Sequence, residues 1–203
     1  MPYSTIKYSI LFMLILSIFL VIRKLKSTHK VTLPTFICSL FLLICAVLLL
    51  FPIENLFITF TSPEQAYEFT YPQNTKVTVV EGAKSTLVMG VNKENEIEYQ
   101  VFPKTKNGWK RLGLLQIQFY QFYPAAGIST TLVRYKPSGD CYAWVHSLRN
   151  QDCEITDELG SQFRSDEKLT GDILHEYYAY VGQPSGTYTL TIDGVDYTLT
   201  GLP

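Results

Sequence analysis

The chain has 203 residues, of which 47% are hydrophobic, and it carries a formal net charge of −1. From residue 62 onward it holds 12 Lys and Arg against 17 Asp and Glu, so this larger part is acidic. An acidic surface lacks the basic footprint of proteins that bind nucleic acid, and we therefore exclude nucleic acid as a partner. About 140 residues follow the apolar N-terminal quarter, enough to bury a hydrophobic core.

Two apolar stretches, Tyr8–Ile22 and Val31–Phe51, fill most of this N-terminal quarter. A helix needs about 20 apolar residues to cross a bilayer, and we predict that each stretch forms a transmembrane helix. The alternative for the first stretch, a cleaved signal peptide, is less well supported, because only Lys7 precedes it and no small-residue cleavage site follows. The expected unit is a two-helix membrane anchor over residues 1–60, in contact with the lipid bilayer.

A basic loop joins the two stretches, and its cations are Arg23, Lys24, Lys26 and Lys30. No Lys or Arg follows the second stretch until Lys76. Because basic loops stay on the cytoplasmic side, the loop 23–30 is expected in the cytoplasm and the domain 61–203 outside it. A second interpretation of the loop is a docking site for lipid headgroups or a partner protein.

The outer domain is expected to begin with a short helix over Pro63–Phe69. Ser62 precedes Pro63, which suits the first helical turn, and stands three residues before Gln65, as in a capping box. The residue before a proline disfavours helix, so Tyr71, followed by Pro72, ends it.

Strand patterns fill most of the remaining chain, in which apolar and polar residues alternate or β-branched residues gather between turn residues. The predicted strands are Lys76–Glu81, Ser85–Val91, Ile97–Val101, Gly113–Tyr123, Ser129–Lys136, Cys141–Ser147, Glu176–Val181, Thr187–Ile192 and Val195–Thr200. Asp193-Gly194 is typical of a type I′ hairpin loop. The polar stretch Asn150–Asp172 is expected to be irregular, with one helical turn at Ser161–Phe163. We therefore predict two transmembrane helices followed by a mainly antiparallel β domain, a sandwich or an open barrel-like sheet, with one short helix.

The stretch Ser62-Pro63-Glu64-Gln65-Ala66-Tyr67 resembles the SPEEAF-like start of the exported domain in a group of small, uncharacterised bacterial membrane-anchored proteins. The segments Pro103–Lys110 and Tyr177–Val181 fit the same pattern. The resemblance implies a β-rich exported domain behind a membrane anchor, and it implies no catalytic site.

Two cysteines, Cys141 and Cys153, lie in the predicted outer domain. An oxidising compartment permits a disulfide between them, which would stabilise the fold by about 2–3 kcal/mol. The alternatives are two free buried thiols, or a catalytic or metal-binding pair, for which the C-x-x-C spacing is missing.

A cluster of cations surrounds one tryptophan, and the candidate ligand surface is Lys104, Lys106, Trp109, Lys110 and Arg111. Cations beside an aromatic ring suit an anionic polymer or a sugar of the cell envelope. The alternative is a polar hairpin loop whose Trp109 packs into the core.

Other groups do not form a recognisable site. His29, His146 and His175 lack the spacing of a metal site or a catalytic motif. The acidic residues between Asp152 and Glu176 lack the spacing of a calcium loop, so we interpret them as a solvated loop. We expect no metal and no cofactor.

The favoured function is a membrane-anchored extracytoplasmic protein with a binding, sensing or accessory role, whose partner is another membrane or cell-wall component. The alternative is a cell-envelope hydrolase or transferase with a site assembled from scattered residues. A third interpretation places the function in the helices, with Cys38, Ser39 and Cys45 at a helix–helix interface.

Overall fold

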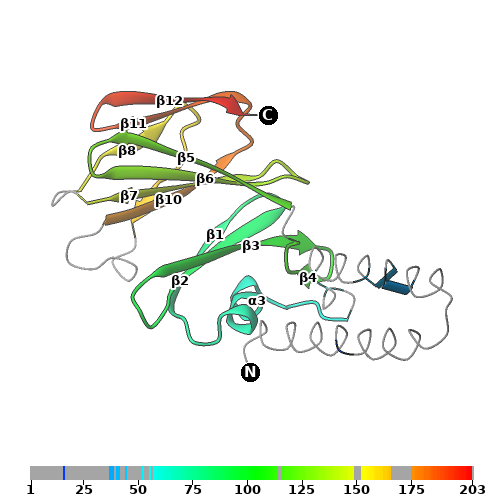
Figure 1. Cartoon of the computed structure of the whole chain (residues 1–203). Coiled ribbons are helices and arrows are strands. Elements are labelled where there is room, and N and C mark those ends of the chain that lie inside the picture. The colour runs from blue at the N-terminus through cyan, green and yellow to red at the C-terminus, as the bar shows by residue number, and fades with distance from the viewer. Residues whose placement is uncertain are drawn as a thin grey trace.

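The computed structural model describes residues 57–113, 116–148, 152–165 and 175–202, and a few residues before position 57. This part of the chain folds into four stacked layers (Figure 1). Helix α3 is the first layer, and three antiparallel sheets follow it. The helix and the third sheet each bury one face, and the first and central sheets, which lie between other layers, bury both.

Helix α3 spans Pro63–Thr70 and begins as predicted. The Ser62 hydroxyl accepts a hydrogen bond from the Gln65 N–H at 3.2 Å, and proline in the first turn loses no helical hydrogen bond. The Gln65 side chain accepts a hydrogen bond from the Thr61 hydroxyl, so it does not complete the capping box. This cap at Ser62 sets the position at which helix α3 begins.

The sheets contain all nine predicted strands and three short strands that the sequence did not predict. The first sheet has the order β1-β2-β3-β4, with β1 Thr75–Glu81, β2 Ser85–Val91, β3 Ile97–Thr105 and β4 Gly108–Trp109. The central sheet has the order β5-β6-β7-β10-β9, with β5 Ile117–Ala125, β6 Ile128–Tyr135, β7 Cys141–Ser147, β10 His175–Gly182 and β9 Arg164–Ser165. The third sheet has the order β12-β11-β8, with β12 Val195–Leu202, β11 Gly186–Ile192 and β8 Ile155–Asp157.

The central sheet is buried on both faces because successive side chains of a strand point to opposite sides. Leu132 and Ala143 face the third sheet, where they belong to a core that includes Leu190. Val133 and Tyr142 face the first sheet and pack in a second core. The central sheet therefore holds the domain together.

The third core lies between α3 and the first sheet. Tyr67 of α3 is fully buried against Val88 and Phe102. Its hydroxyl donates a hydrogen bond to the Glu98 carbonyl at 2.8 Å, so the polar end of the ring is satisfied. The helix thus covers the outer face of the first sheet.

The turn predictions are partly confirmed. Asp193 and Gly194 have φ values of 51° and 78°, as a type I′ turn requires. Pro124 does not end the strand, because β5 continues to Ala125 through a shift in register after Phe122. The helical turn predicted at Ser161–Phe163 is wrong, since these residues have no regular structure.

The structure corrects the predicted fold at its N-terminal end. Over the described residues from position 57 onward, the observed architecture is mostly antiparallel β with one short helix. Within the described residues, no helix is both long and apolar enough to span a bilayer, so the two-helix hairpin is not seen. Most of Tyr8–Ile22 and Val31–Phe51, and all of the basic loop Arg23–Lys30, lie outside those residues.

Candidate functional site

One end of the central sheet leaves part of its first-sheet face uncovered. On the covered part of this face, the paired residues Val133 and Tyr142 are buried. On the uncovered part, two residues away on the same strands, the paired residues Thr131 and Trp144 are only half-buried. We call this surface the sheet ledge. By strand register and alternation, its side chains are Phe119, Gln121, Tyr123, Ser129, Thr131, Trp144, His146 and Glu176.

The ledge contains a buried carboxylate with a histidine in front of it. Strands β7 and β10 place Glu176 opposite His146, and Trp144 is two residues away on the same face. One carboxylate oxygen of Glu176 lies 2.5 Å from His146 Nδ1, and the other accepts a hydrogen bond from Trp144 Nε1. The Glu176 side chain is 3% exposed and the His146 side chain 32%. The imidazole therefore reaches solvent, while the carboxylate behind it does not.

The electrostatics follow from this geometry. Burial raises the pKa of Glu176, and the hydrogen bonds from His146 and Trp144 oppose the rise by stabilising the charged form. A carboxylate that accepts Nδ1–H fixes the orientation and tautomer of an imidazole. In the neutral ring, Nε2 of His146 then carries the lone pair and is the nitrogen available to a ligand.

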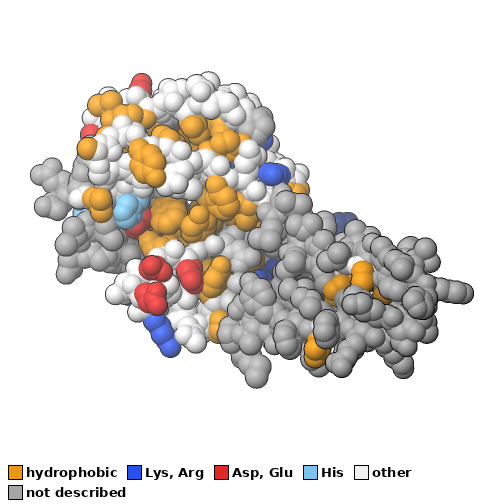
Figure 2. Space-filling view, in the orientation of Figure 1, with side chains coloured by type: hydrophobic (Ala, Val, Ile, Leu, Met, Phe, Trp, Pro, Cys, Tyr) orange, Lys and Arg blue, Asp and Glu red, His pale blue; other side chains and the backbone are white. Residues whose placement is uncertain are grey.

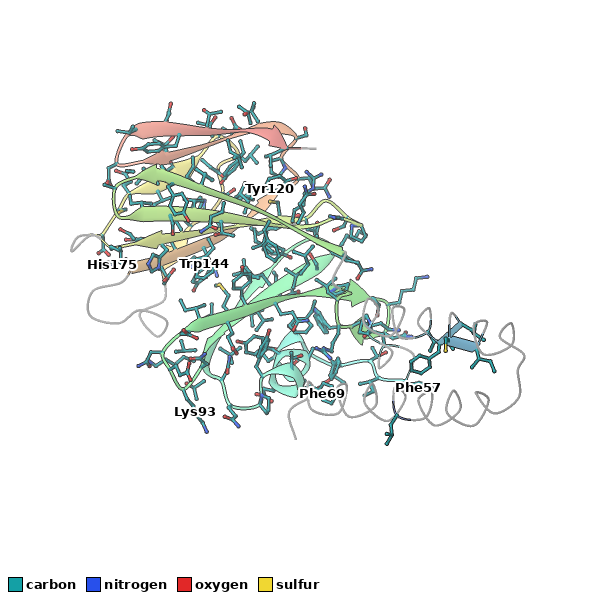
Figure 3. All side chains as sticks on the ribbon, in the orientation of Figure 1. Phe57, Phe69, Lys93, Tyr120, Trp144 and His175 are labelled. Carbon is teal, nitrogen blue, oxygen red and sulfur yellow. The ribbon has the colours of Figure 1, made fainter. Side chains whose placement is uncertain are left out.

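Aromatic rings form the border of the ledge with the first sheet. Tyr99 of β3 contacts Trp144 edge to face at a centroid distance of 5.0 Å, and it contacts Phe119 in the same manner at 6.2 Å. Trp144 lies between the central and first sheets in Figure 3. Figure 2 shows hydrophobic side chains gathered between these layers, and acidic side chains on the layer below.

A shallow pocket of about 420 Å³ adjoins the histidine at the end of the β5–β6 hairpin. Its lining residues are Tyr123, Ala125, Ala126, Gly127, Ile128, Ser129, His146 and Leu148. Tyr123 is 73% exposed and Leu148 is 54% exposed, and both lie on this one pocket. The ledge thus combines exposed apolar groups with a few converging polar ones, as ligand sites do.

The second histidine of the described chain also meets a carboxylate. His175 Nδ1 lies 3.1 Å from Asp152 Oδ1, but the Asp152 side chain is 85% exposed. Water screens such a surface pair, which contributes little. Of the two carboxylates that meet these histidines, Glu176 is buried and Asp152 is exposed.

The predicted basic–aromatic surface is only partly assembled around Trp109. The Lys104 ammonium lies 5.5 Å from the centre of the Trp109 ring, a cation–π contact. Trp109 is half-buried against the core that contains Phe60, and its Nε1 donates a hydrogen bond to the Thr86 hydroxyl at 3.1 Å. The ring is therefore chiefly a packing group.

The other cations of the predicted surface point to different surroundings. Lys106 is exposed in the β3–β4 turn. The Lys110 ammonium donates a hydrogen bond to the Asn55 carbonyl at 2.7 Å, and Arg111 is only 9% exposed. Two of the four predicted cations are thus used within the fold, and the structure does not present the set as one open surface.

The disulfide predicted between Cys141 and Cys153 is absent, and both thiols are free and buried. Cys141 begins β7, whereas Cys153 Sγ lies 3.5 Å from the hydroxyl of Ser147, which ends β7. Six strand residues span about 20 Å, and a disulfide requires Cα atoms within about 7 Å. The strand between them keeps the two thiols apart, which loop length alone did not reveal.

In the acidic stretch after Cys153, the Asp157 carboxylate has structural partners. It accepts hydrogen bonds from the Tyr188 hydroxyl at 3.0 Å and from the Ser161 N–H at 2.7 Å. Among the residues that the structure describes, no group of three His, Cys, Asp or Glu side chains is placed to hold a metal ion.

The sequence interpretation placed Glu176 both in the acidic stretch and at the start of a strand, and it gave His146 a role only in the hydrolase alternative, beside an unspecified Ser, Cys or carboxylate. The sequence offers one weak indication of a site at His146 and at Glu176, because each is a polar residue among apolar strand residues. Their pairing depends on the register of β7 and β10, which local patterns do not encode. No family model, curated protein or solved structure matches the chain. The function therefore has to be argued from the geometry of the ledge.

Proposed function

We propose that the β domain is a ligand-binding module, with a sensing or accessory role, and that the sheet ledge is its binding surface. The observation that carries this proposal is the buried Glu176 carboxylate, which holds the half-exposed His146 beside an aromatic border. A buried charge is costly, so folds retain one chiefly where its partners offset the cost or function requires it.

The chemistry of the ledge favours a carbohydrate ligand. His146 Nε2 and the hydroxyls of Ser129 and Thr131 offer hydrogen bonds on one face of the sheet. Phe119, 54% exposed, and Tyr123 offer apolar area to the flat side of a sugar ring. A sugar presents hydroxyl groups and an apolar ring face together, so it can contact both the polar groups and the aromatic rings of the ledge.

The test is a titration of the purified domain with a panel of soluble oligosaccharides, monitored by saturation-transfer NMR and tryptophan fluorescence. We expect at least one sugar to bind, and Phe119→Ala and His146→Ala to weaken binding by about tenfold each. Val195→Ala is the matched control, because Val195 is also exposed but lies in the distant β11–β12 hairpin. Binding that all three variants retain equally would place the site elsewhere.

A second candidate function, hydrolysis or group transfer, rests on the same pair of residues. An imidazole oriented by a buried carboxylate is the arrangement of a general base. Ser129 is the cross-strand neighbour of His146 on β6, so its hydroxyl lies on the same face. Turnover of chromogenic glycosides or esters that is lost in His146→Ala and Ser129→Ala would favour this function over binding alone.

The proposed setting is outside the cytoplasm, with another membrane or cell-wall component as partner. The support for this setting is the charge distribution of the sequence, which has no Lys or Arg between Lys30 and Lys76. An envelope polysaccharide would satisfy both this setting and the chemistry of the ledge.

A further inference from the structure

Strand β10 has an outer edge that its neighbour only partly covers. β9 contains two residues, Arg164 and Ser165, which pair with Tyr178 and Tyr177. The following residues of β10, 179–182, pair with β7 on the inner side. Within the described part of the chain, no strand pairs with their outer side.

A groove of about 870 Å³ runs along this edge, on the side of the central sheet opposite the β5 edge. Its size falls in the range of about 300–1,000 Å³ that ligand clefts occupy. One wall is the segment 159–162, which leads into β9, and the other is formed by β1 and Glu64 of α3. The lining residues are Glu64, Val79, Val80, Glu81, Leu159, Gly160, Ser161, Gln162, Arg164, Tyr178, Ala179, Tyr180, Val181, Gly182 and Gln183.

The groove therefore has a strand edge as its floor. An exposed edge presents a row of backbone N–H and C=O groups that another extended chain can pair with. β9 already pairs antiparallel with the first part of this edge, so its geometry accepts a strand. At the far end, Gly182 has no atom within 4 Å of the position that a Cβ would occupy, so the groove is open there.

The length and charge of the groove select its occupant. The register of β10 shifts between Tyr180 and Gly182, and such a bulge ends regular pairing, which favours a short segment over the full strand of a second copy. The lining contains two carboxylates, Glu64 and Glu81, against one guanidinium, Arg164. A cationic side chain on the bound segment complements this balance.

We propose that residues 179–182 of β10 bind a short extended peptide segment of a partner protein, which pairs with the free edge of β10 in line with β9 and places a Lys or Arg against Glu81. This site is separate from the sheet ledge and does not depend on a sugar ligand. The backbone hydrogen bonds supply the affinity, and β-branched residues suit the extended conformation that the bound segment must adopt.

The test is a selection of random linear peptides on the immobilised full-length chain, followed by anisotropy titrations of the enriched peptides. We expect enrichment of sequences with alternating β-branched residues and at least one Lys or Arg. Glu81→Lys should weaken their binding by roughly threefold or more, as expected for reversing one surface charge. Glu68→Lys is the matched control, since Glu68 is an exposed residue of α3 that does not line the groove.

Two further measurements test the strand pairing itself. Bound peptide should slow amide hydrogen exchange at residues 179–182. An N-methyl group on the peptide should abolish binding when it is placed at every second residue and have little effect at the residues between, because only every second N–H faces the partner strand. The proposal is overturned if no peptide is enriched, if Glu81→Lys and Glu68→Lys behave alike, or if the protected amides lie outside β10.

Discussion

The Nδ1 atom of His146 lies 2.5 Å from Oε1 of Glu176, although the two residues are 30 positions apart in the chain. Burial raises the pKa of the Glu176 carboxyl in the folded protein. In the unfolded chain this group titrates near its ordinary pKa of about 4.3. Just above that pH, the folded state binds more protons than the unfolded state, so this group makes stability fall as the pH rises.

Replacing Glu176 by Gln removes this titration. We expect the melting temperature of the wild type, measured relative to Glu176→Gln, to be highest at acid pH and to decrease as the pH rises past about 4.3. Thermal unfolding at a series of pH values measures the difference. Glu68→Gln, at an exposed position, should show no such trend. A constant difference between wild type and Glu176→Gln would contradict the raised pKa.

The β fold was predictable because its strands carry local signals. Ile97, Tyr99 and Val101 alternate with polar residues, and Asp193-Gly194 specifies its turn without help from the rest of the fold. β8 was missed because Ile155 is its only buried residue, and it forms a strand only because β11 offers an edge. β8 is thus a strand because it pairs with β11, and its own sequence pattern does not predict it.

The candidate site was not predictable in the same way. His146 and Glu176 meet only when β7 and β10 pair in one register, and a shift of one residue would turn Glu176 to the opposite face. The helical hairpin was inferred from hydropathy alone, and the described residues contain no helix that could span a bilayer. Hydropathy describes the composition of a segment, whereas the ledge depends on which strands pair and in which register.

Asp140 ties the central sheet to the first sheet, and we expect its removal to destabilise the domain. It is fully buried, and its Oδ2 accepts hydrogen bonds from the Lys84 N–H at 2.7 Å and the Ser85 hydroxyl at 2.9 Å. Asp140→Ala removes the charged acceptor of both hydrogen bonds and should cost about 2–4 kcal/mol in the free energy of unfolding. Ser85→Ala leaves the bond from the Lys84 N–H in place, removes the Ser85 bonds to Asp140 and to the Tyr142 hydroxyl, and should cost about 1–2 kcal/mol. Urea denaturation measures both, and equal losses would argue against a shared acceptor.

Gly82 lies so close to two tyrosines that no side chain fits. A Cβ at this position would collide with the Tyr142 hydroxyl oxygen and lie 3.0 Å from Tyr180 Cε2. We expect Gly82→Ala to destabilise the domain by about 1–3 kcal/mol through overpacking. In a Tyr142→Phe background, which removes the obstructing oxygen, the same change should cost less. A double-mutant cycle by urea denaturation measures this coupling, and additive effects would contradict it.

The two cysteines of the domain are expected to remain reduced and unreactive in the folded state. Burial raises the pKa of Cys141 to about 12, and Cys153 is only 8% exposed. Because the thiolate is the reactive form, a thiol reagent at pH 8 should modify both residues only after unfolding. The measurement uses protein in which Cys38 and Cys45 are replaced by Ala. A melting temperature that falls when a reductant is added would instead reveal a disulfide.

The proposed location of the domain outside the cytoplasm is tested with a reporter cysteine at Ser185. Ser185 is exposed between β10 and β11, so Ser185→Cys disturbs no packed group. With the native cysteines replaced by Ala, we expect a membrane-impermeant maleimide to label the full chain in intact cells. Lysis should then add little further labelling. Labelling only after lysis would place the domain in the cytoplasm, and the search for ligands of the ledge would turn from envelope sugars to cytoplasmic ones.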